Sequence, residues 1–157
     1  MPAARFRAAL VVVAALAFAL RLLYLSGAAQ SPLYQHPALD GRVNDEAAWA
    51  LARGVAEPGL SAGGMATHDA GAPQPYFRPP GYAHFLAMVY KVAGHDLHAA
   101  RVVQAVVGAM AVLLLGLLGA SLWDARAGVA GALLAALYGP AIYFDGELVS
   151  ASLELAL

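Results

Sequence analysis

The feature that most constrains this chain is a long run without any charged residue, from Val102 to Trp123. A helix needs ~20 predominantly apolar residues to cross the hydrocarbon core of a bilayer, and this run is long enough. It ends in a Trp, a residue that is enriched at membrane interfaces. Glycines at which another helix can approach closely lie along it: Gly108, Gly116 and Gly119. The sequence therefore predicts a membrane-spanning helix over residues 98–123.

Further apolar segments have the same character. Ala8 to Leu20 is free of charge and extends to Leu25 if Arg21 reaches the interface, which predicts a span over residues 6–26. A third span is predicted over residues 126–144, and another apolar segment occupies residues 148–157. Because that last segment has only roughly ten residues, it is too short to cross a bilayer. We therefore interpret residues 1–157 as the N-terminal part of one membrane domain, in which the last span only begins.

Composition supports a membrane protein and argues against other classes. The chain is 61% hydrophobic and 12% charged, whereas soluble domains are ~45–50% apolar and ~25% charged. The absence of Cys excludes a disulfide framework and a thiolate metal site. A formal net charge of −1 without a basic run gives no signal for a nucleic-acid partner. The predicted fold class is all-α, a polytopic transmembrane protein.

The first apolar segment also has an alternative interpretation. Arg5 and Arg7, a short apolar run and the small residues of "LSGAAQ" together resemble a cleavable signal peptide. Arg21 and the bulky Leu-Leu-Tyr-Leu after it fit a cleavage region poorly. We therefore favour a span that stays in the protein.

The placement of Lys and Arg predicts the orientation in the membrane. Arg5 and Arg7 precede the first span, and Arg126 lies in the short turn between the second and third spans, so both places are predicted to be cytoplasmic. The loop over residues 27–97 and the short "DGE" after Phe144 then lie on the outer face. We expect a multi-pass protein of the inner (plasma) membrane with a cytoplasmic N-terminus.

The long outer loop carries two predicted helices, over residues 45–54 and 80–94. In the first, Asn44 is a suitable cap, which would put Asp45 and Glu46 in the first turn, where the helix dipole favours negative charge. The second is too short to span and is expected at the interface. Its aromatic stripe is expected to face the membrane: Tyr82, Phe85 and Tyr90. A Gly-, Ala- and Pro-rich loop is predicted between the two helices.

The order of these segments carries a resemblance to a known family. "NDEAAWALARG" is followed by "YFRPPGYAHFLAMVYKVAGHD", then by an A-A-R-x-x-Q motif that opens the second span and by D-G-E before the last segment. This order resembles the N-terminal portion of GT-C superfamily membrane glycosyltransferases. Within that superfamily it is similar to the bacterial protein O-mannosyltransferase and aminoarabinose transferase type.

The resemblance implies a reaction and a catalytic base. Such enzymes move a hexosyl or pentosyl group from a polyprenyl-phosphate carrier, with inversion, to an acceptor hydroxyl on the outer face. An acid in the first outer loop acts as general base, and Asp45 occupies the matching position. If the loop has a different register, Asp40 takes that role instead. A positioned base contributes roughly 10²- to 10⁴-fold to such a step.

The resemblance also implies binding residues and partners. A second acidic motif after the third span binds a divalent metal in some members or shapes the donor phosphate pocket, and Asp145 and Glu147 lie there. Glu46 neighbours the base, and Arg78 is suited to clamp a donor phosphate or to anchor the loop at anionic headgroups. The implied partners are a polyprenyl-phosphate sugar, a lipid, glycan or protein acceptor, and membrane lipids. Alone, the fragment is expected to be inactive.

A different class of function stays open at this point. In a non-catalytic membrane module, such as a transporter half or a scaffold subunit, Asp45 and Glu46 would be solvated helix caps. A transporter more often places ionisable groups inside its spans, whereas every acid before Glu154 lies outside the apolar runs. The histidines show no metal-binding spacing, although His95 and His98 lie three residues apart. The pattern favours chemistry at the outer interface.

Overall fold

The computed structural model describes residues 1–55 and 80–156, and this part of the chain is built of helices without a strand. The helices are α1 (Ala3–Ala28), α2 (Pro32–Gln35), α3 (Leu39–Ala52), α4 (Pro80–Ala93), α5 (Leu97–Leu122), α6 (Ala125–Ala136), α7 (Gly139–Gly146) and α8 (Ala151–Ala156). The predicted all-α class is confirmed. Arg78 and the predicted Gly- and Pro-rich loop lie outside the described residues.

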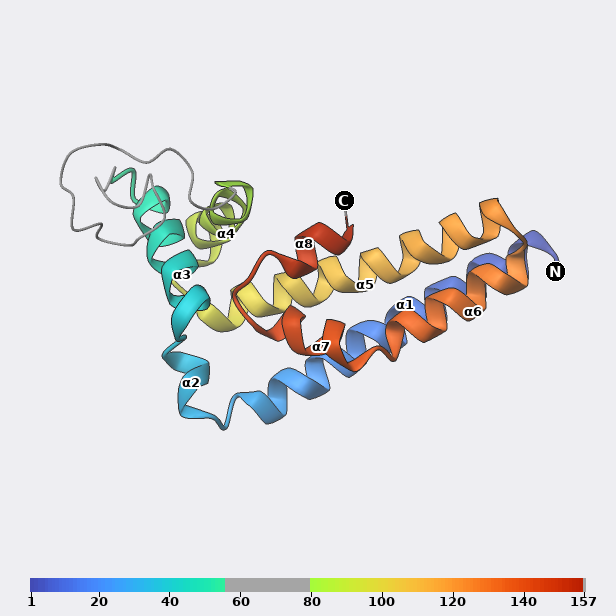
Figure 1. Cartoon of the computed structure of the whole chain (residues 1–157), viewed down its shortest axis with the longest axis horizontal. Coiled ribbons are helices and arrows are strands. Elements are labelled where there is room, and N and C mark those ends of the chain that lie inside the picture. The colour runs from blue at the N-terminus through green and yellow to red at the C-terminus, as the bar shows by residue number, and fades with distance from the viewer. Residues whose placement is uncertain (56–79, 157) are drawn as a thin grey trace.

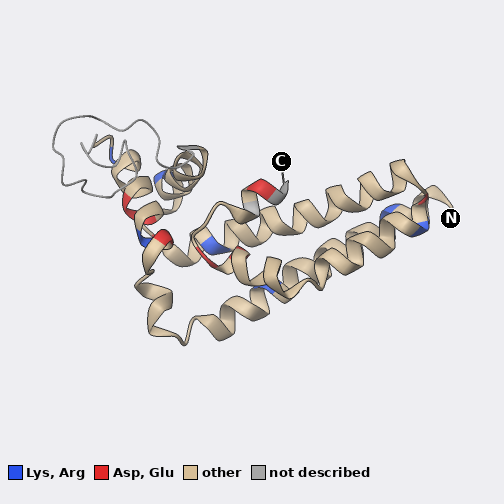
Figure 2. Cartoon of the chain, viewed as in Figure 1, with Lys and Arg blue, Asp and Glu red and all other residues tan. Residues whose placement is uncertain are grey.

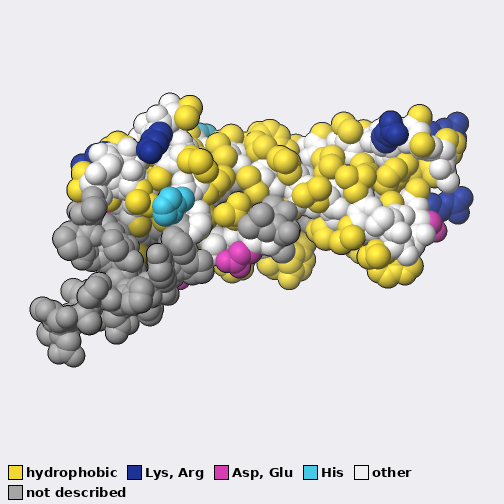
Figure 3. Space-filling model, turned by 90° about the horizontal axis from the view of Figure 1, so that it is seen from above, with side chains coloured by type: hydrophobic (Ala, Val, Ile, Leu, Met, Phe, Trp, Pro, Cys, Tyr) yellow, Lys and Arg dark blue, Asp and Glu magenta, His cyan; other side chains and the backbone are white. Residues whose placement is uncertain are grey.

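The long helices α1, α5 and α6 lie side by side in an elongated bundle (Figure 1). The N-terminus and the α5–α6 turn are at one end, and α2, α3 and α4 gather at the other. α1 and α5, each of 26 residues, are long and apolar enough to cross a membrane. On the face that Figure 3 shows, apolar side chains cover much of the bundle, and basic groups gather at the end that holds the N-terminus. Large apolar side chains such as Val12, Leu23 and Leu134 are exposed. The outer surface of the bundle is therefore suited to lipid.

Small residues bring α5 and α6 together. A Cβ on Gly119 would lie 3.1 Å from the Cα of Gly128, and a Cβ on Gly128 would lie 2.8 Å from the backbone nitrogen of Ala120. Gly116 faces Ala132 of α6 in the same way, with 3.0 Å between the Cβ atoms. Small side chains let helix backbones approach closely. The predicted role of Gly116 and Gly119 is confirmed, whereas Gly108 has a different neighbour, described below.

The predicted third span is broken rather than continuous. α6 and α7 meet at an angle of 54°, and Tyr138, the cap of α7, has an extended backbone with ψ of 100°. Pro140 lies in the first turn of α7, where the missing N–H of a proline is tolerated, but a proline cannot continue the preceding helix. Gly139 and Pro140 therefore explain the break.

Helix α3 begins earlier than predicted. Its cap is Ala38, and Asp40 lies in its first turn, so Asp45 lies in the middle of the helix. The predicted capping role of Asn44 is wrong, because its side-chain amide donates instead to the backbone carbonyl of Leu148, at 2.8 Å. A long-range hydrogen bond thus replaces the local one.

The aromatic stripe of α4 faces the protein rather than the membrane. Tyr82, Leu86 and Tyr90 are buried in one core cluster with Ala48 of α3 and Leu97 of α5. The exposed apolar side chains of α4 are Met88 and Val92, on the opposite side. Because α3 offers an apolar face at this end of the bundle, the aromatic rings pack against it. The prediction of a membrane-facing belt is wrong for this reason.

Candidate functional site

Asp45 is the best-supported candidate of the outer loop, because α3 buries it against α4. Its Oδ1 accepts a hydrogen bond from the Tyr90 hydroxyl at 2.5 Å and lies 2.8 Å from His95 Nε2. The Asp45 side chain is 11% exposed. Within residues 1–55 and 80–156, both polar contacts go to Oδ1 and none to Oδ2. One carboxylate oxygen is thus held, and the other is available for a different partner.

Aromatic rings surround this carboxylate. His95 stacks on Trp49 with 4.7 Å between the ring centroids and 12° between the planes. Tyr90 contacts His95 edge-on at 5.0 Å. The guanidinium of Arg53 lies over the ring of Trp49, 5.2 Å from its centroid. We call Asp45, Trp49, Tyr90 and His95 the Asp45 cluster.

The environment keeps Tyr90 a neutral donor. Burial, followed by the hydrogen bond to Asp45 and the charge of that carboxylate, raises the pKa of Tyr90 well above its ordinary value of 10.0. A phenol with a raised pKa stays protonated throughout the neutral range. Tyr90 therefore donates to Asp45 at every pH at which a membrane enzyme normally works.

A second polar region lies beside the Asp45 cluster, at the end of α7 and the start of its connection to α8. It consists of residues 145–148, which we call the 145–148 segment. The backbone carbonyls of Gly146, Glu147 and Leu148 each accept a side-chain hydrogen bond at 2.8 Å, from Arg101, Gln104 and Asn44 respectively. Arg101 and Gln104 are the polar positions of the A-A-R-x-x-Q motif on α5. Because Asn44 precedes Asp45 in α3, the 145–148 segment also fixes the helix that carries the candidate base.

Asp145 begins this segment and forms a buried ion pair with Arg21. The Arg21 Nε donates to Asp145 Oδ2 at 2.5 Å, and the two side chains are 3% and 2% exposed. Arg21 Nη1 also donates to the Ala17 carbonyl at 3.1 Å. The expectation that Arg21 reaches the membrane interface is therefore wrong, because it has a buried partner. Most charged residues lie toward the two ends of the long helices, and few lie along their middle (Figure 2).

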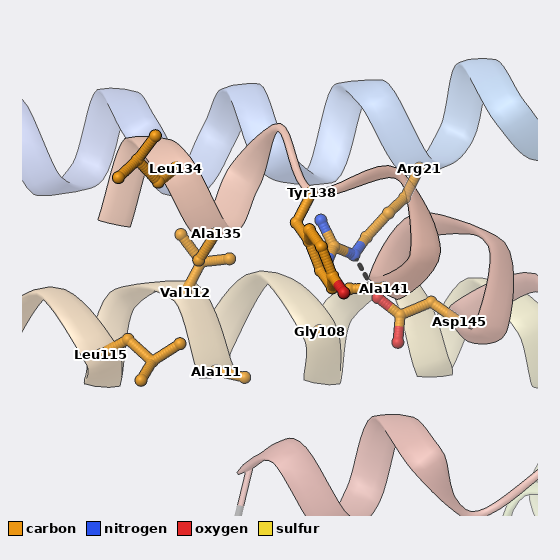
Figure 4. A pocket seen from close by; sticks show the side chains of 10 residues that line it. All are labelled: Arg21, Gly108, Ala111, Val112, Leu115, Leu134, Ala135, Tyr138, Ala141 and Asp145. Atoms are coloured by element: carbon orange, nitrogen blue, oxygen red, sulfur yellow. Dashed lines mark hydrogen bonds and ion pairs between the residues drawn. The ribbon is translucent and has the colours of Figure 1, made fainter. Parts of the chain in front are cut away.

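Gly108 makes room for the ion pair. A Cβ at this position would lie 2.6 Å from Arg21 Nε and 2.8 Å from Asp145 Cγ. The pair lies at one edge of a cavity of about 250 Å³, whose other walls are apolar side chains of α5 and α6 together with Tyr138 and Ala141 (Figure 4). Among the described residues, Asp145 Oδ1 has no hydrogen-bond partner.

Arg101 is the second buried arginine, and it joins α5 to α2. Its guanidinium lies 4.0 Å from the ring centroid of Tyr34 and donates to the Tyr34 carbonyl at 2.8 Å. The Tyr34 hydroxyl in turn contacts His98 Nδ1 at 2.6 Å. Arg101 thus binds two backbone carbonyls, one of them in the 145–148 segment, which is a structural role in the outer end of the bundle.

The other predicted site residues are placed differently. Asp40 is exposed in the first turn of α3, on a different face from the buried Asp45. Glu46 is exposed and pairs with Arg42 at 2.7 Å. Glu147 is partly buried, and it joins the 145–148 segment through its backbone carbonyl. The structure therefore brings Asp45 and the 145–148 segment together and leaves Asp40 and Glu46 on the surface.

The donor set does not fit a divalent metal. Within residues 1–55 and 80–156, no three His, Asp or Glu side chains lie close enough together to hold a metal ion. Asp145 instead faces the guanidinium of Arg21, a cation that would repel a second cation. The metal expected at Asp145 and Glu147 stays a prediction.

The sequence patterns missed several residues of the site. The patterns predict that Tyr90 and Arg21 lie toward the membrane, and the spacing of His95 indicates no role for it. Their true partners are far away along the chain, so no local pattern identifies them. The one local signal was the polar pair of the A-A-R-x-x-Q motif at the start of an otherwise apolar helix.

Comparison with known proteins supports the family resemblance. Residues 77–146 match the family model described as dolichyl-phosphate-mannose-protein mannosyltransferase. No curated protein sequence and no solved structure matches the chain. The matched region runs from α4 to α7 and contains Tyr90, His95, Arg101, Gln104 and Asp145. Together with the apolar helices, this match supports a similarity to GT-C mannosyltransferase-like membrane proteins.

Proposed function

We propose that this protein is an integral-membrane glycosyltransferase that moves a sugar from a polyprenyl-phosphate donor to an acceptor hydroxyl, with inversion, and that Asp45 is its general base. The observation that carries the proposal is the environment of Asp45, a mostly buried carboxylate whose donors both contact Oδ1. A solvated helix cap would lie at a helix start, whereas Asp45 lies in mid-helix and is held by tertiary contacts.

In the proposed step, Oδ2 of Asp45 takes the proton of the acceptor hydroxyl as its oxygen attacks the anomeric carbon. The new carbon–oxygen bond forms on one face of the sugar, and the bond to the phosphate oxygen breaks on the other. The polyprenyl phosphate leaves with the bonding electron pair. Tyr90 and His95 keep the carboxylate in a fixed orientation, which favours a productive hydrogen bond to the acceptor.

Other predicted residues complete the proposal. The 145–148 segment, with Asp145 and Glu147, shapes the donor phosphate pocket beside α3. Arg78 clamps the donor phosphate. Asp40 is the alternative base, whereas Glu46 neighbours Asp45 in the chain but takes no part in the proposed step. The hydrogen bond from Asn44 to Leu148 supports this arrangement, because it connects the helix of the base to the 145–148 segment.

The proposed orientation puts the reaction on the outer face of the inner membrane. Arg5 and Arg7 at the start of α1 and Arg126 at the start of α6 belong to the same end of the bundle (Figure 1). By the positive-inside rule this end is cytoplasmic. The Asp45 cluster and the 145–148 segment are toward the opposite end, where a lipid-borne sugar and an external acceptor can meet. The acceptor is a lipid, a glycan or a protein.

Transfer in membranes tests the proposal. Membranes that contain the full-length gene product receive a pool of radiolabelled polyprenyl-phosphate sugars, and transfer of label to acceptors is compared among wild type, Asp45→Asn, Asp40→Asn and Glu46→Gln at matched expression. We expect Asp45→Asn to lower transfer by roughly 10²- to 10⁴-fold. Glu46→Gln is the matched control, because this neighbouring acid is exposed and paired only with Arg42 among the described residues.

Each outcome of this experiment has a clear meaning. Wild-type membranes that transfer no more label than membranes without the gene would refute the reaction class. Transfer by Asp45→Asn at the wild-type rate would refute the base. If Asp40→Asn abolishes transfer and Asp45→Asn does not, the base is Asp40.

A further inference from the structure

His95 differs from an ordinary surface histidine, because its imidazole contacts both Asp45 and Trp49. It lies in the short connection between α4 and α5, directly after Gly94. Gly94 has φ of 77°, a left-handed conformation that glycine adopts without strain. This turn brings the imidazole back against α3, where it contacts the Oδ1 of Asp45 and the ring of Trp49. The side chain nevertheless stays 37% exposed, so water can reach it.

We propose that His95 is a positioning residue for the transfer reaction, which orients Asp45 while it is neutral and weakens Asp45 as a base when it gains a proton. This inference rests on the proposed function. In the neutral state, Nε2–H donates to Oδ1 of Asp45, so Nδ1 carries the lone pair. The stacking on Trp49 and the edge contact with Tyr90 fix the plane of the ring.

The chemistry of protonation then determines the direction of the effect. A proton taken up by Nδ1 from water turns the ring into a cation, with Nε2 2.8 Å from Asp45 Oδ1. A cation at this distance stabilises the carboxylate and lowers its affinity for a proton. Asp45 therefore accepts the proton of the acceptor hydroxyl less readily, and transfer slows as the pH falls. Histidine side chains ordinarily titrate near pH ~6.5, within the range that an outer membrane face experiences.

The other charged groups around His95 do not produce this effect. Tyr90 of α4 stays neutral, because its pKa is raised. Arg53, the cap at the end of α3, lies over the ring of Trp49, and a guanidinium does not lose its proton in proteins. The Asp96 carboxylate caps α5 by accepting from the backbone N–H groups of His98 and Ala99. Lys91 of α4 is exposed. Among the described residues, the two side chains in contact with Asp45 are thus a neutral phenol and the imidazole of His95, and imidazole is the side-chain type that ordinarily changes charge near neutral pH.

The test is the pH dependence of label transfer in wild type, His95→Gln and His98→Gln, in the membranes and with the labelled sugar pool described above. Gln keeps an N–H for Oδ1 but does not titrate. We expect His95→Gln to stay within about threefold of the wild-type rate at neutral pH. Below pH ~6.5 it should retain a larger share of that rate than wild type does. His98→Gln, a matched control that does not contact Asp45, should keep the wild-type profile. A wild-type acidic profile in His95→Gln would overturn the inference.

A second measurement keeps the inference testable if His95→Gln folds poorly. In protein labelled with ¹⁵N-histidine, neutral His95 should carry its proton on Nε2, and Asp45→Asn should weaken this preference. An unchanged tautomer in Asp45→Asn would refute the contact on which the inference depends. The two proposals fail separately. If the Asp45→Asn variant is active, the proposed base is refuted. If the Asp45→Asn variant is inactive but the His95→Gln variant keeps the wild-type pH profile, only the role of His95 is refuted.

Discussion

The substitution Gly108→Ala tests whether the buried ion pair between Arg21 of α1 and Asp145 of α7 stabilises the fold. The added Cβ would lie 2.6 Å from Arg21 Nε and 2.8 Å from Asp145 Cγ, too close for either atom to stay in place. Neither side chain can move freely, because Arg21 is also bound to the Ala17 carbonyl and Asp145 begins the segment held by Arg101, Gln104 and Asn44. The ion pair itself is therefore expected to break.

The magnitude follows from two opposing effects. Separating the partners of a buried ion pair costs about 3 to 5 kcal/mol, and replacing a helical glycine by alanine returns up to about 1 kcal/mol. The expected net loss is about 2 to 4 kcal/mol, which lowers the midpoint of thermal unfolding by roughly 5 to 15 °C. Gly131→Ala is the matched control on α6, because a Cβ there meets no atom within 4 Å. It should unfold at or slightly above the wild-type temperature.

Thermal unfolding in detergent micelles, followed by circular dichroism, measures both variants. A double-mutant cycle separates the clash with the ion pair from other effects. When Arg21→Ala and Asp145→Ala together remove the pair, Gly108→Ala should become neutral or stabilising on that background. The reasoning is wrong if Gly108→Ala unfolds like wild type, or if it costs as much without the ion pair as with it.

Two further predictions concern the outer end of the bundle. Arg101→Lys should lower the free energy of unfolding by about 2 to 4 kcal/mol, because an ammonium cannot bind the Gly146 and Tyr34 carbonyls as a planar fork. Arg126→Lys is an exposed control and should not change this free energy. Equal effects of the two substitutions on unfolding in detergent would contradict the structural role of Arg101. Because the pKa of Tyr90 is raised above 10.0 in the folded state, its stabilising contribution is complete below pH 10 and decreases as the pH rises above it. The stability difference between wild type and Tyr90→Phe should therefore shrink above pH 10 in unfolding measurements, and a difference that grows there would refute the raised pKa.

The membrane character and the helices of this protein could be predicted from the sequence, because they depend on local properties. The charge-free run from Val102 to Trp123 is close in its bounds to α5, and the glycines at 116 and 119 lie where α6 approaches. The predicted helix over residues 80–94 likewise agrees closely with α4. Length, apolar content and the positions of Gly and Pro act within a few residues, so a single segment is enough to identify them.

The tertiary structure decided which polar residues act together. Asp45 and Asp40 are equivalent as acids in a loop, and only the packing of α3 on α4 buries one against Tyr90 and His95 and leaves the other exposed. In the same way, Arg21 could be an interfacial anchor by sequence, and only the return of the chain through α7 gives it Asp145 as a partner. A buried charge must find its counterpart wherever the fold places it, and that choice is made by packing between segments that are distant in the sequence.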